Sequence, residues 1–193
     1  MTLKQTDLQT YPFIVDQAKM RAAMADFGWR PASGPEIPQL VELGERLITG
    51  KLADVAVIER IHAQTGITAW VFGDPIEGLV LCVPLSETGL DALSASAFSP
   101  GDPDDAHVAA AGQPCAGMYI GVYAGATHAA RKAVMVGAGL IRMHLFSQVP
   151  CFARAATEDG ARSMVSLGWA PANFGIDKLW MQGALTAPET QVA

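Results

Sequence analysis

His128 is the residue whose type and position best suit acid–base chemistry. A histidine side chain titrates near neutral pH, so a small change in its surroundings decides its charge. The sequence around His128 predicts the start of a helix, where the charged form of the ring is disfavoured and the neutral form can accept a proton. His128 is therefore a candidate general base. The alternative is that it caps this helix or lies on the surface.

Two tyrosines precede this histidine. Tyr119 and Tyr123 lie four residues apart in a predicted strand. Successive side chains of a strand point to opposite faces, so this spacing predicts that both phenols lie on the same face of the sheet. A neutral phenol can donate a proton to a leaving group, which makes each tyrosine a candidate general acid. The alternative is packing in the core, with the hydroxyl groups hydrogen-bonded locally.

Small residues dominate the segment between the predicted strand and helix. In order, they are Gly125, Ala126, Thr127, His128, Ala129 and Ala130. A strand that ends in such a turn leaves the first backbone N–H groups of the next helix free, and these groups bind phosphate together with the helix dipole. The absence of bulky side chains lets a pyrophosphate approach the backbone. Arg131 and Lys132 would add positive charge one turn into the helix.

Other titratable residues are less specific. Glu77 lies beside a glycine in a predicted hairpin and could bind an amine, although hairpin charges are usually solvated. His62, His107 and His144 are expected in the core or at the surface. Residues 99–105, SPGDPDD, carry three aspartates, but their spacing is not that of an EF-hand, so a solvated loop is expected.

The three cysteines are too few and too widely spaced to form a disulfide framework or a zinc site. They are Cys82, Cys115 and Cys151. Buried and inert thiols are expected, since free cysteine is often buried. Cys151 would need an activating base to act as a nucleophile.

Helical spacing of apolar residues marks the N-terminal third. It predicts helices over residues 16–27, 39–48 and 52–64, with loop residues between the first two. The third segment also contains valine and isoleucine, so a strand is an alternative there. We expect residues 1–66 to form a helical segment packed on a core of residues 67–193, within one globular domain.

The spacing of apolar residues changes at residue 67 from one typical of helices to one typical of strands. Two short apolar runs around a Gly-Asp-Pro turn, residues 67–72 and 76–85, predict a hairpin. A helix over residues 86–98 follows. The remaining elements are a strand over 116–124, a helix over 125–146, a strand over 150–156, a helix capped by Thr157 and ended by Gly168, and a strand over 174–181. This order predicts an α/β fold with a mixed sheet flanked by helices.

Two glycines lie inside the long helix predicted over residues 125–146. Gly137 and Gly139 each cost about 1 kcal/mol relative to alanine in a helix interior. A close packing contact would explain their presence.

This order of elements resembles the GNAT superfamily of acyl-CoA-dependent N-acyltransferases. The most specific stretch is residues 149–171, VPCFARAATEDGARSMVSLGWAP: a strand, a capped helix, and then Leu-Gly-Trp-Ala-Pro. Upstream, residues 125–130 occupy the place of the family's pyrophosphate loop, usually Gln/Arg-x-x-Gly-x-Gly/Ala. The resemblance covers residues 67–183. It implies a GNAT-like mixed sheet, acetyl-CoA or another acyl-CoA as co-substrate, and a small-molecule or protein amine as acceptor.

The chain departs from the family's pattern, as a degenerate member would. Gly125 stands where the family has Gln or Arg, and His128 where it has the middle Gly, so only Ala130 fits outright. Many members carry a tyrosine in the C-terminal helix that protonates the departing thiolate. Met164 stands at that position, and methionine has no proton to give. The loop then binds CoA weakly, binds it with altered geometry, or does not bind it.

Length, composition and charge limit which classes of protein the chain can belong to. The 193 residues predict one domain, and the balance of 13 Lys and Arg against 19 Asp and Glu gives a net charge of −6, which disfavours nucleic-acid binding. The N-terminus lacks the apolar segment of a secretory signal. The longest strongly apolar run, residues 133–141, is about half of the roughly 20 residues that a membrane span needs. A cytoplasmic protein is expected, with no membrane partner and no metal.

The leading hypothesis is an acyl-CoA-dependent N-acyltransferase. The resemblance implies that the cofactor lies against Tyr123, Ala124, Gly125, Ala126, Thr127, His128, Ala129, Ala130 and Arg131. His128, Tyr119 and Tyr123 are the catalytic candidates, with the acceptor near the two tyrosines. The rival is a non-catalytic binding or dimerisation module of the same fold, a possible homodimer. A third hypothesis is an acyltransferase that uses a longer acyl donor, whose chain would lie in a tunnel lined by Leu79, Leu81 and Val83.

Overall fold

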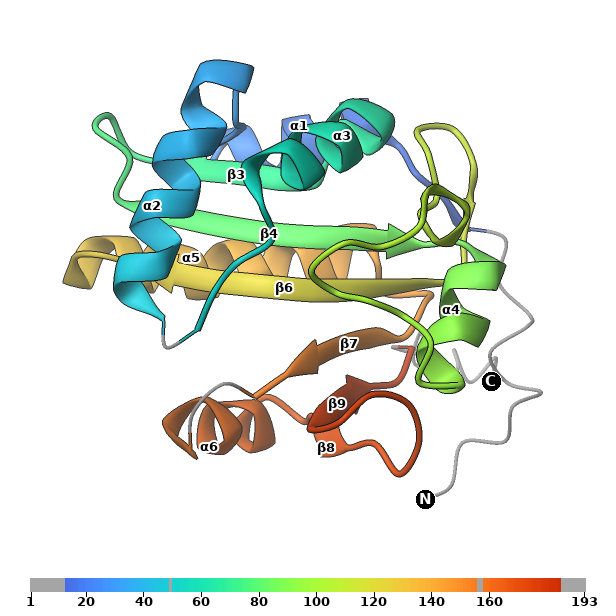
Figure 1. The fold of residues 1–193 in the computed structure, drawn as a ribbon. Coiled ribbons are helices and arrows are strands. Elements are labelled where there is room, and N and C mark those ends of the chain that lie inside the picture. The colour runs from blue at the N-terminus through green and yellow to red at the C-terminus, as the bar shows by residue number, and fades with distance from the viewer. Residues whose placement is uncertain (1–12, 49, 156–157, 185–193) are drawn as a thin grey trace, which may run out of the picture.

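A seven-stranded mixed sheet forms the centre of the protein (Figure 1). The structure is a computed structural model and describes residues 13–48, 50–155 and 158–184. In spatial order the strands are β2 (Trp29–Pro31), β3 (Ala69–Phe72), β4 (Gly78–Leu85), β6 (Gly117–Gly125), β7 (Cys151–Arg154), β9 (Leu179–Gln182) and β8 (Ala170–Pro171). Two further strands, β1 (Phe13–Ile14) and β5 (Pro114–Cys115), form a separate pair.

The pair β6 and β7 differs from the other neighbours in the seven-stranded sheet. These two strands are parallel, whereas the other pairs are antiparallel. They pair over residues 118–120 and 151–153 and then separate, as Figure 1 shows. A parallel pair needs a crossover connection, and α5 (His128–Leu140) supplies it.

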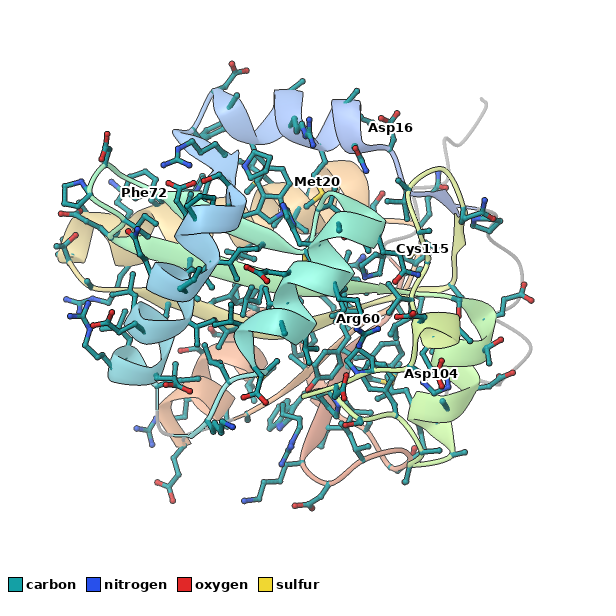
Figure 2. The ribbon with its side chains drawn as sticks, turned by 45° about the horizontal axis from the view of Figure 1, so that its top comes forward. Asp16, Met20, Arg60, Phe72, Asp104 and Cys115 are labelled. Atoms are coloured by element: carbon teal, nitrogen blue, oxygen red, sulfur yellow. The ribbon has the colours of Figure 1, made fainter. Side chains whose placement is uncertain are left out.

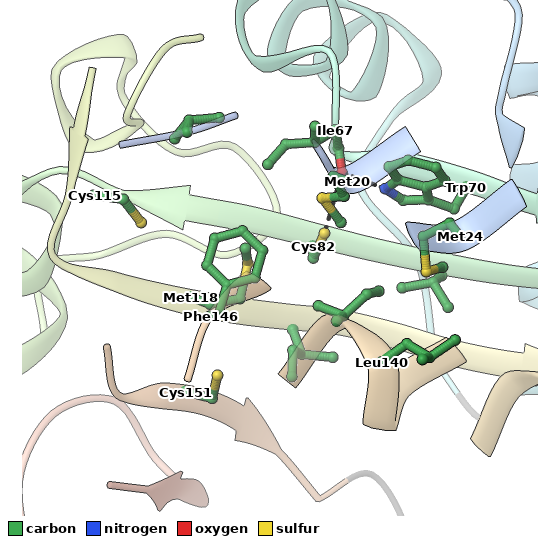
Figure 3. Packing of buried hydrophobic residues seen from close by; sticks show 14 of the residues in the cluster. Met20, Met24, Ile67, Trp70, Cys82, Cys115, Met118, Leu140, Phe146 and Cys151 are labelled. Atoms are coloured by element: carbon green, nitrogen blue, oxygen red, sulfur yellow. Dashed lines mark hydrogen bonds between the residues drawn. The ribbon is translucent and has the colours of Figure 1, made fainter. Parts of the chain in front are cut away.

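Helices cover both faces of the sheet. On one face lie α2 (Ile37–Leu47) and α3 (Val55–Thr65), in front of the sheet in Figure 1, while α5 lies behind it. The α5 face also carries α1 (Gln17–Ala25), whose Met20 and Met24 enter the same buried cluster as Val134 of α5. Figure 3 shows part of this cluster. The remaining α-helices are α4 (Glu87–Ser94) and α6 (Glu158–Ser166).

The predicted fold class is confirmed. The hairpin, the strand–helix–strand succession of β6, α5 and β7, and the helical reading of residues 52–64 all hold. Among the helices in the described ranges, none is long and apolar enough to cross a membrane. Thr157, the predicted cap of α6, lies outside the described residues.

Three local predictions differ from the structure. Trp29–Pro31 was expected in a loop and forms the edge strand β2, a position that tolerates proline. The last strand begins at Leu179 instead of residue 174, because Gly175 and Lys178 have positive φ values of 79° and 56° that break an extended backbone. The long helix ends at Leu140 and continues as a π-helical turn over Ile141–Leu145.

A buried arginine explains how the π-helical turn is held. The Arg142 guanidinium donates to the carbonyl oxygen of Val149 at 2.9 Å and to the side-chain oxygen of Gln182 at 2.8 Å. It also donates to the carbonyl oxygens of Phe146 and Gly183. The end of α5 is therefore tied to the end of β9.

One of the two helix glycines has the expected packing partner. The indole of Trp29 lies against Gly137 and donates from Nε1 to the carbonyl oxygen of Ala133 at 3.2 Å. A Cβ on residue 137 would come within 2.9 Å of Nε1, whereas a Cβ on Gly139 would meet no atom within 4 Å. The packing explanation is confirmed for Gly137 and wrong for Gly139.

This difference gives a matched pair of substitutions. We expect Gly137→Ala to lower the free energy of unfolding by about 1–2 kcal/mol, because the rigid, buried indole must shift. Gly139→Ala adds the same methyl group in open space and should raise it by up to about 1 kcal/mol through helix propensity. Urea unfolding of both variants measures the effects. Equal signs would contradict the packing assignment.

Candidate functional site

Strand β6 contains a bulge at Gly121. Leu81 of β4 pairs with Val122 and the next residue, Cys82, pairs with Ile120, so Gly121 has no partner in the register. An extra residue of this kind reverses which face the following side chains point to. Ile120 accordingly lies in the cluster on the α5 face, and Val122, two residues later, in the cluster on the α2 face.

The bulge separates the two tyrosines. Tyr119 is buried on the α3 and α4 side, where its ring centroid lies 5.4 Å from that of Phe98. Tyr123 packs against the cluster on the α5 side. The predicted shared face is therefore wrong, since one inserted residue between the tyrosines cancels the effect of an even spacing.

A pocket of about 490 Å³ opens on the Tyr119 side of the sheet. Tyr119 and the bulge residue Gly121 line it from β6. Apolar side chains from α3 and β4 add Ile58, Ile61, Leu81 and Val83. Of the wall predicted from Leu79, Leu81 and Val83, the last two line the pocket. Leu79 instead packs in the cluster beneath α2.

An arginine clamp holds one wall of this pocket. Arg60 of α3 donates to the Asp102 carboxylate at 2.8 Å and to the Pro103 carbonyl oxygen at 2.9 Å, and it also binds the Asp105 carboxylate. Figure 2 shows Arg60 beside the loop that carries Asp104. The same loop contributes Pro100 and Gly101 to the pocket lining. The loop is exposed, as expected, but Asp102 and Asp105 bind Arg60 and so fix the loop to α3.

The opposite end of β6 forms the predicted small-residue loop. The strand ends at Gly125, and Thr127 caps α5 by accepting a hydrogen bond from the Ala130 N–H at 3.0 Å. A Cβ on Gly125 would lie 2.6 Å from the Arg131 nitrogen, so only glycine lets the strand approach the helix this closely.

The start of α5 presents free donors to solvent. Within the described ranges, the backbone N–H groups of Thr127, His128 and Ala129 make no hydrogen bond, and these residues are exposed. The N–H of Ala126 is used, because it donates to the Glu77 carbonyl oxygen at 2.8 Å. The arrangement can bind an anion through the three free N–H groups and the helix dipole.

Glu77 brings a carboxylate to this end of the helix. Its side chain accepts a hydrogen bond from the Thr127 hydroxyl at 3.1 Å. A negative charge at a helix N-terminus is stabilised by the dipole. Glu77 is not among the residues that line the pocket and lies beside the loop at the start of α5.

The structure does not bring His128 and Tyr119 together. At a strand rise of about 3.3 Å per residue, Gly125 lies about 20 Å along β6 from Tyr119. His128 lies beyond Gly125, is exposed, and is the first residue of α5, while Thr127 provides the cap. His128 therefore lies at the start of α5 and is not among the residues that line the pocket.

Neither His62 nor His107 lines the pocket, and His107 is half-buried with its ring centroid 6.1 Å from that of Phe98. His62 accepts a hydrogen bond at Nδ1 from the Ala69 N–H at 3.1 Å, and burial lowers the pKa of its ring. Met164, at the position of the family's tyrosine, is half-buried against the core on the α5 side. In the described part of the chain, no three His, Cys, Asp or Glu side chains are grouped to hold a metal ion.

The three cysteines are free and buried, as predicted (Figure 3). Burial raises the pKa of the Cys115 thiol to about 12 and that of Cys151 to about 11. Burial also raises the pKa of Cys82. The reactive thiolate form is therefore disfavoured at all three positions.

Comparison with known proteins adds structural neighbours. No protein-family description and no curated protein sequence matches the chain. Ard1 from Thermoplasma volcanium is 14% identical with a TM-score of 0.48, over 82% of this chain and 97% of that chain. A histone acetyltransferase HPA2 and related acetyltransferase from Corynebacterium glutamicum is 18% identical with a TM-score of 0.46, over 83% and 97%. Arabidopsis thaliana Naa50, in complex with a bisubstrate analogue, is 11% identical with a TM-score of 0.46, over 80% and 97%.

The topology of the chain itself defines its class. A hairpin of β3 and β4 is followed by β6, the small-residue loop, α5, β7, α6 and β9. This is the order on which the resemblance to the GNAT superfamily rests, and it assembles into one mixed sheet with helices on both faces. The protein therefore has a GNAT-like fold.

The buried thiols predict a loss of stability at alkaline pH. Unfolded thiols ionise near the ordinary value of 9.0, whereas the folded thiols keep their protons to about pH 11 or higher. Between pH 9 and 11 the unfolded state binds fewer protons, so the free energy of unfolding should fall by about 1.4 kcal/mol per thiol and pH unit.

Urea unfolding at pH 8 and pH 10.5 measures this dependence. Cys151→Ala should make the fall shallower, because one of the three buried thiols is gone. A thiol reagent should label none of the three in the folded wild type. Rapid labelling, or an unchanged pH dependence in the variant, would contradict the assignment.

Proposed function

We propose that the protein is an acyl-CoA-dependent N-acyltransferase. The observation that carries this proposal is the geometry of β6, which links two sites of different chemistry. Free backbone donors for an anion lie at its C-terminal end, and an apolar pocket lies at its bulge. An acyl-CoA has the same division, because a pantetheine arm separates its pyrophosphate from its thioester.

The anion end would hold the pyrophosphate. Its donors are the N–H groups of Thr127, His128 and Ala129, with Arg131 exposed one turn further on. The cofactor-binding stretch in this proposal runs over residues 123–131. Gly125 keeps the strand close to the helix, and Ala126 and Ala129 leave the surface open.

The thioester would lie at the bulge. Gly121 is outside the β4 ladder, lines the pocket and is exposed, so its backbone N–H is a candidate donor to the thioester oxygen. A donor directed at the oxygen that gains charge stabilises the tetrahedral intermediate. In this proposal the pantetheine arm passes between β6 and β7 beyond residue 120, where the two strands no longer pair.

Tyr119 is the proposed general acid. Burial raises its pKa to about 12, and the positive charge of Arg154 opposes part of this rise. The phenol therefore keeps its proton at neutral pH. The amine nitrogen attacks the carbonyl carbon, the C–S bond breaks, and the CoA thiolate takes the Tyr119 proton. The proton that the amine loses then restores the phenol.

The amine must arrive without its extra proton. The lining residues that the structure describes include no carboxylate or histidine, but they include Lys51, Arg154 and Lys178. Neighbouring cations lower the pKa of an ammonium group and favour the neutral, nucleophilic form.

Tyr119→Phe tests the acid. We expect the turnover number for acyl transfer to fall about a hundredfold, with acyl-CoA affinity within twofold of the wild type. Tyr123→Phe is the matched control: it keeps the backbone of the cofactor-binding stretch, and the phenol that it alters packs on the α5 side of the sheet, so turnover should be unchanged. Release of CoA followed with a thiol reagent gives both rates. Equal losses in the two variants would remove Tyr119 from this role.

Calorimetric titration with acetyl-CoA and with a longer acyl-CoA tests the anion end. Ala126→Glu places a carboxylate at an exposed position of the loop and should abolish binding. Glu77→Gln removes the carboxylate that already lies there and should tighten binding about two- to fivefold. Ala22→Glu, the same change on the exposed surface of α1, is the control. If neither acetyl-CoA nor the longer acyl-CoA gave heat with the wild-type protein, the proposal would be refuted.

A non-catalytic binding or dimerisation module is the second candidate. The Glu77 carboxylate at the helix end favours it, because this charge opposes a phosphate. Exposed apolar side chains on α5 and α6 also fit an interface, namely Met135, Val136 and Val165. The discriminating result is a dimeric mass in solution together with no effect of acyl-CoA on the melting temperature.

A further inference from the structure

Among the described residues, three cations and no carboxylate line the pocket beside Tyr119, although the whole chain carries a net charge of −6. Lys51 comes from the connection between α2 and α3, Arg154 from the end of β7, and Lys178 from the residue before β9. The lining below them is apolar. A ligand that fits this pocket must therefore combine a negative group with an apolar body.

Two of these cations have no charged partner. Lys51 lies 2.8 Å from the Asp54 carboxylate, whereas Arg154 and Lys178 form no ion pair with any residue in the described ranges. The β7–β9 register places Arg154 opposite Leu179, and hence next to Lys178. An arginine beside a lysine is a strong carboxylate site, because the guanidinium can donate two parallel hydrogen bonds.

The side chain of Arg154 lies on the same side of the sheet as Tyr119. Phe152, two residues earlier in β7, shares a buried cluster with Tyr119, and alternate residues of a strand face the same way. Arg154 and Tyr119 also line the same pocket, and the positive charge of Arg154 lowers the pKa of Tyr119. A negative group held at Arg154 would therefore lie beside the proposed general acid.

The backbone conformation of Lys178 is a second, independent observation in favour of a ligand site. Its φ is 56°, in the left-handed region that glycine adopts without strain and lysine rarely adopts. Neighbouring turns of this chain use glycine for the same conformation, as at Gly168 and Gly175. The placement of a lysine at this position indicates that its side chain has a role that offsets the backbone strain.

We infer that the acceptor is a small amine that carries a carboxylate and an apolar side chain, in the manner of an apolar amino acid. Arg154 and Lys178 bind the carboxylate, and the surface formed by Ile58, Ile61, Leu81 and Val83 takes the side chain. The amine then points toward Gly121 and Tyr119, where the thioester would lie. This inference rests on the proposed acyltransferase function for its chemistry, but the carboxylate site itself needs no acyl donor.

Matched pairs of amines that differ only in the carboxylate test the inference. The pairs are L-leucine with isoamylamine and L-phenylalanine with 2-phenylethylamine. Binding is measured by calorimetry without acyl-CoA, and transfer is measured with acetyl-CoA present. We expect each acid to bind at least about tenfold tighter than its decarboxylated partner.

Three variants assign this preference to the two cations. Arg154→Met should remove most of it, and Arg154→Lys should restore part of it. Lys178→Gly should weaken binding of the acid while leaving the melting temperature equal or higher, because it relieves the positive φ. Arg21→Met, at an exposed arginine of α1, is the control and should change nothing. If Lys178→Gly lowered both the affinity for the acid and the melting temperature, Lys178 would have a merely structural role.

The outcomes separate the two proposals. Acid preference without any acyl-CoA binding refutes the acyltransferase and supports the carboxylate site. Transfer to the decarboxylated amines at equal or higher rates refutes the carboxylate site and supports the acyltransferase. Tighter binding of O-phosphoethanolamine than of either amino acid would overturn the choice of a carboxylate over a phosphate.

Discussion

One inserted residue in the central strand determines the layout of the candidate site. Gly121 has no partner in the β4–β6 register, and the side chains after it face the opposite side of the sheet from their expected direction. Tyr119 therefore faces the pocket and Tyr123 faces α5. The bulge lies directly after residue 120, where β6 and β7 cease to pair. The irregular backbone, the pocket and the divergence of the strands thus coincide at one point.

Two glycines set how closely α5 can approach the sheet. At Gly125 the strand passes so near the first turn of α5 that a Cβ would meet backbone atoms of Ala130 and Arg131. At Gly137 the helix rests on the Trp29 indole, which is 1% exposed and belongs to the edge strand β2. The helix is thus positioned at both ends by residues without side chains. The direction of its free N–H groups depends on these contacts.

Periodicity and turn residues were sufficient to predict the six α-helices of the described ranges, the longer strands β3, β4, β6, β7 and β9, and the small-residue loop at the start of α5, but not the short strands β1, β2, β5 and β8. Each of the predicted elements is encoded in contiguous residues. The bulge was not predictable, because it depends on pairing between β4 and β6, which are far apart in the sequence. The pocket was not predictable either. Lys51, Arg154 and Lys178 come from three separate segments, and Arg60 finds its aspartate partners more than 40 residues away.

The two anion-binding regions differ in how their charge is compensated. At the start of α5, Glu77 supplies a carboxylate from the protein itself, so part of the positive potential of the helix end is already used. In the pocket, Arg154 and Lys178 have no such partner among the described residues, although both residues are exposed to water. A negative group on the acceptor would therefore meet no carboxylate among the described residues that line the pocket, whereas a pyrophosphate at the start of α5 would meet that of Glu77.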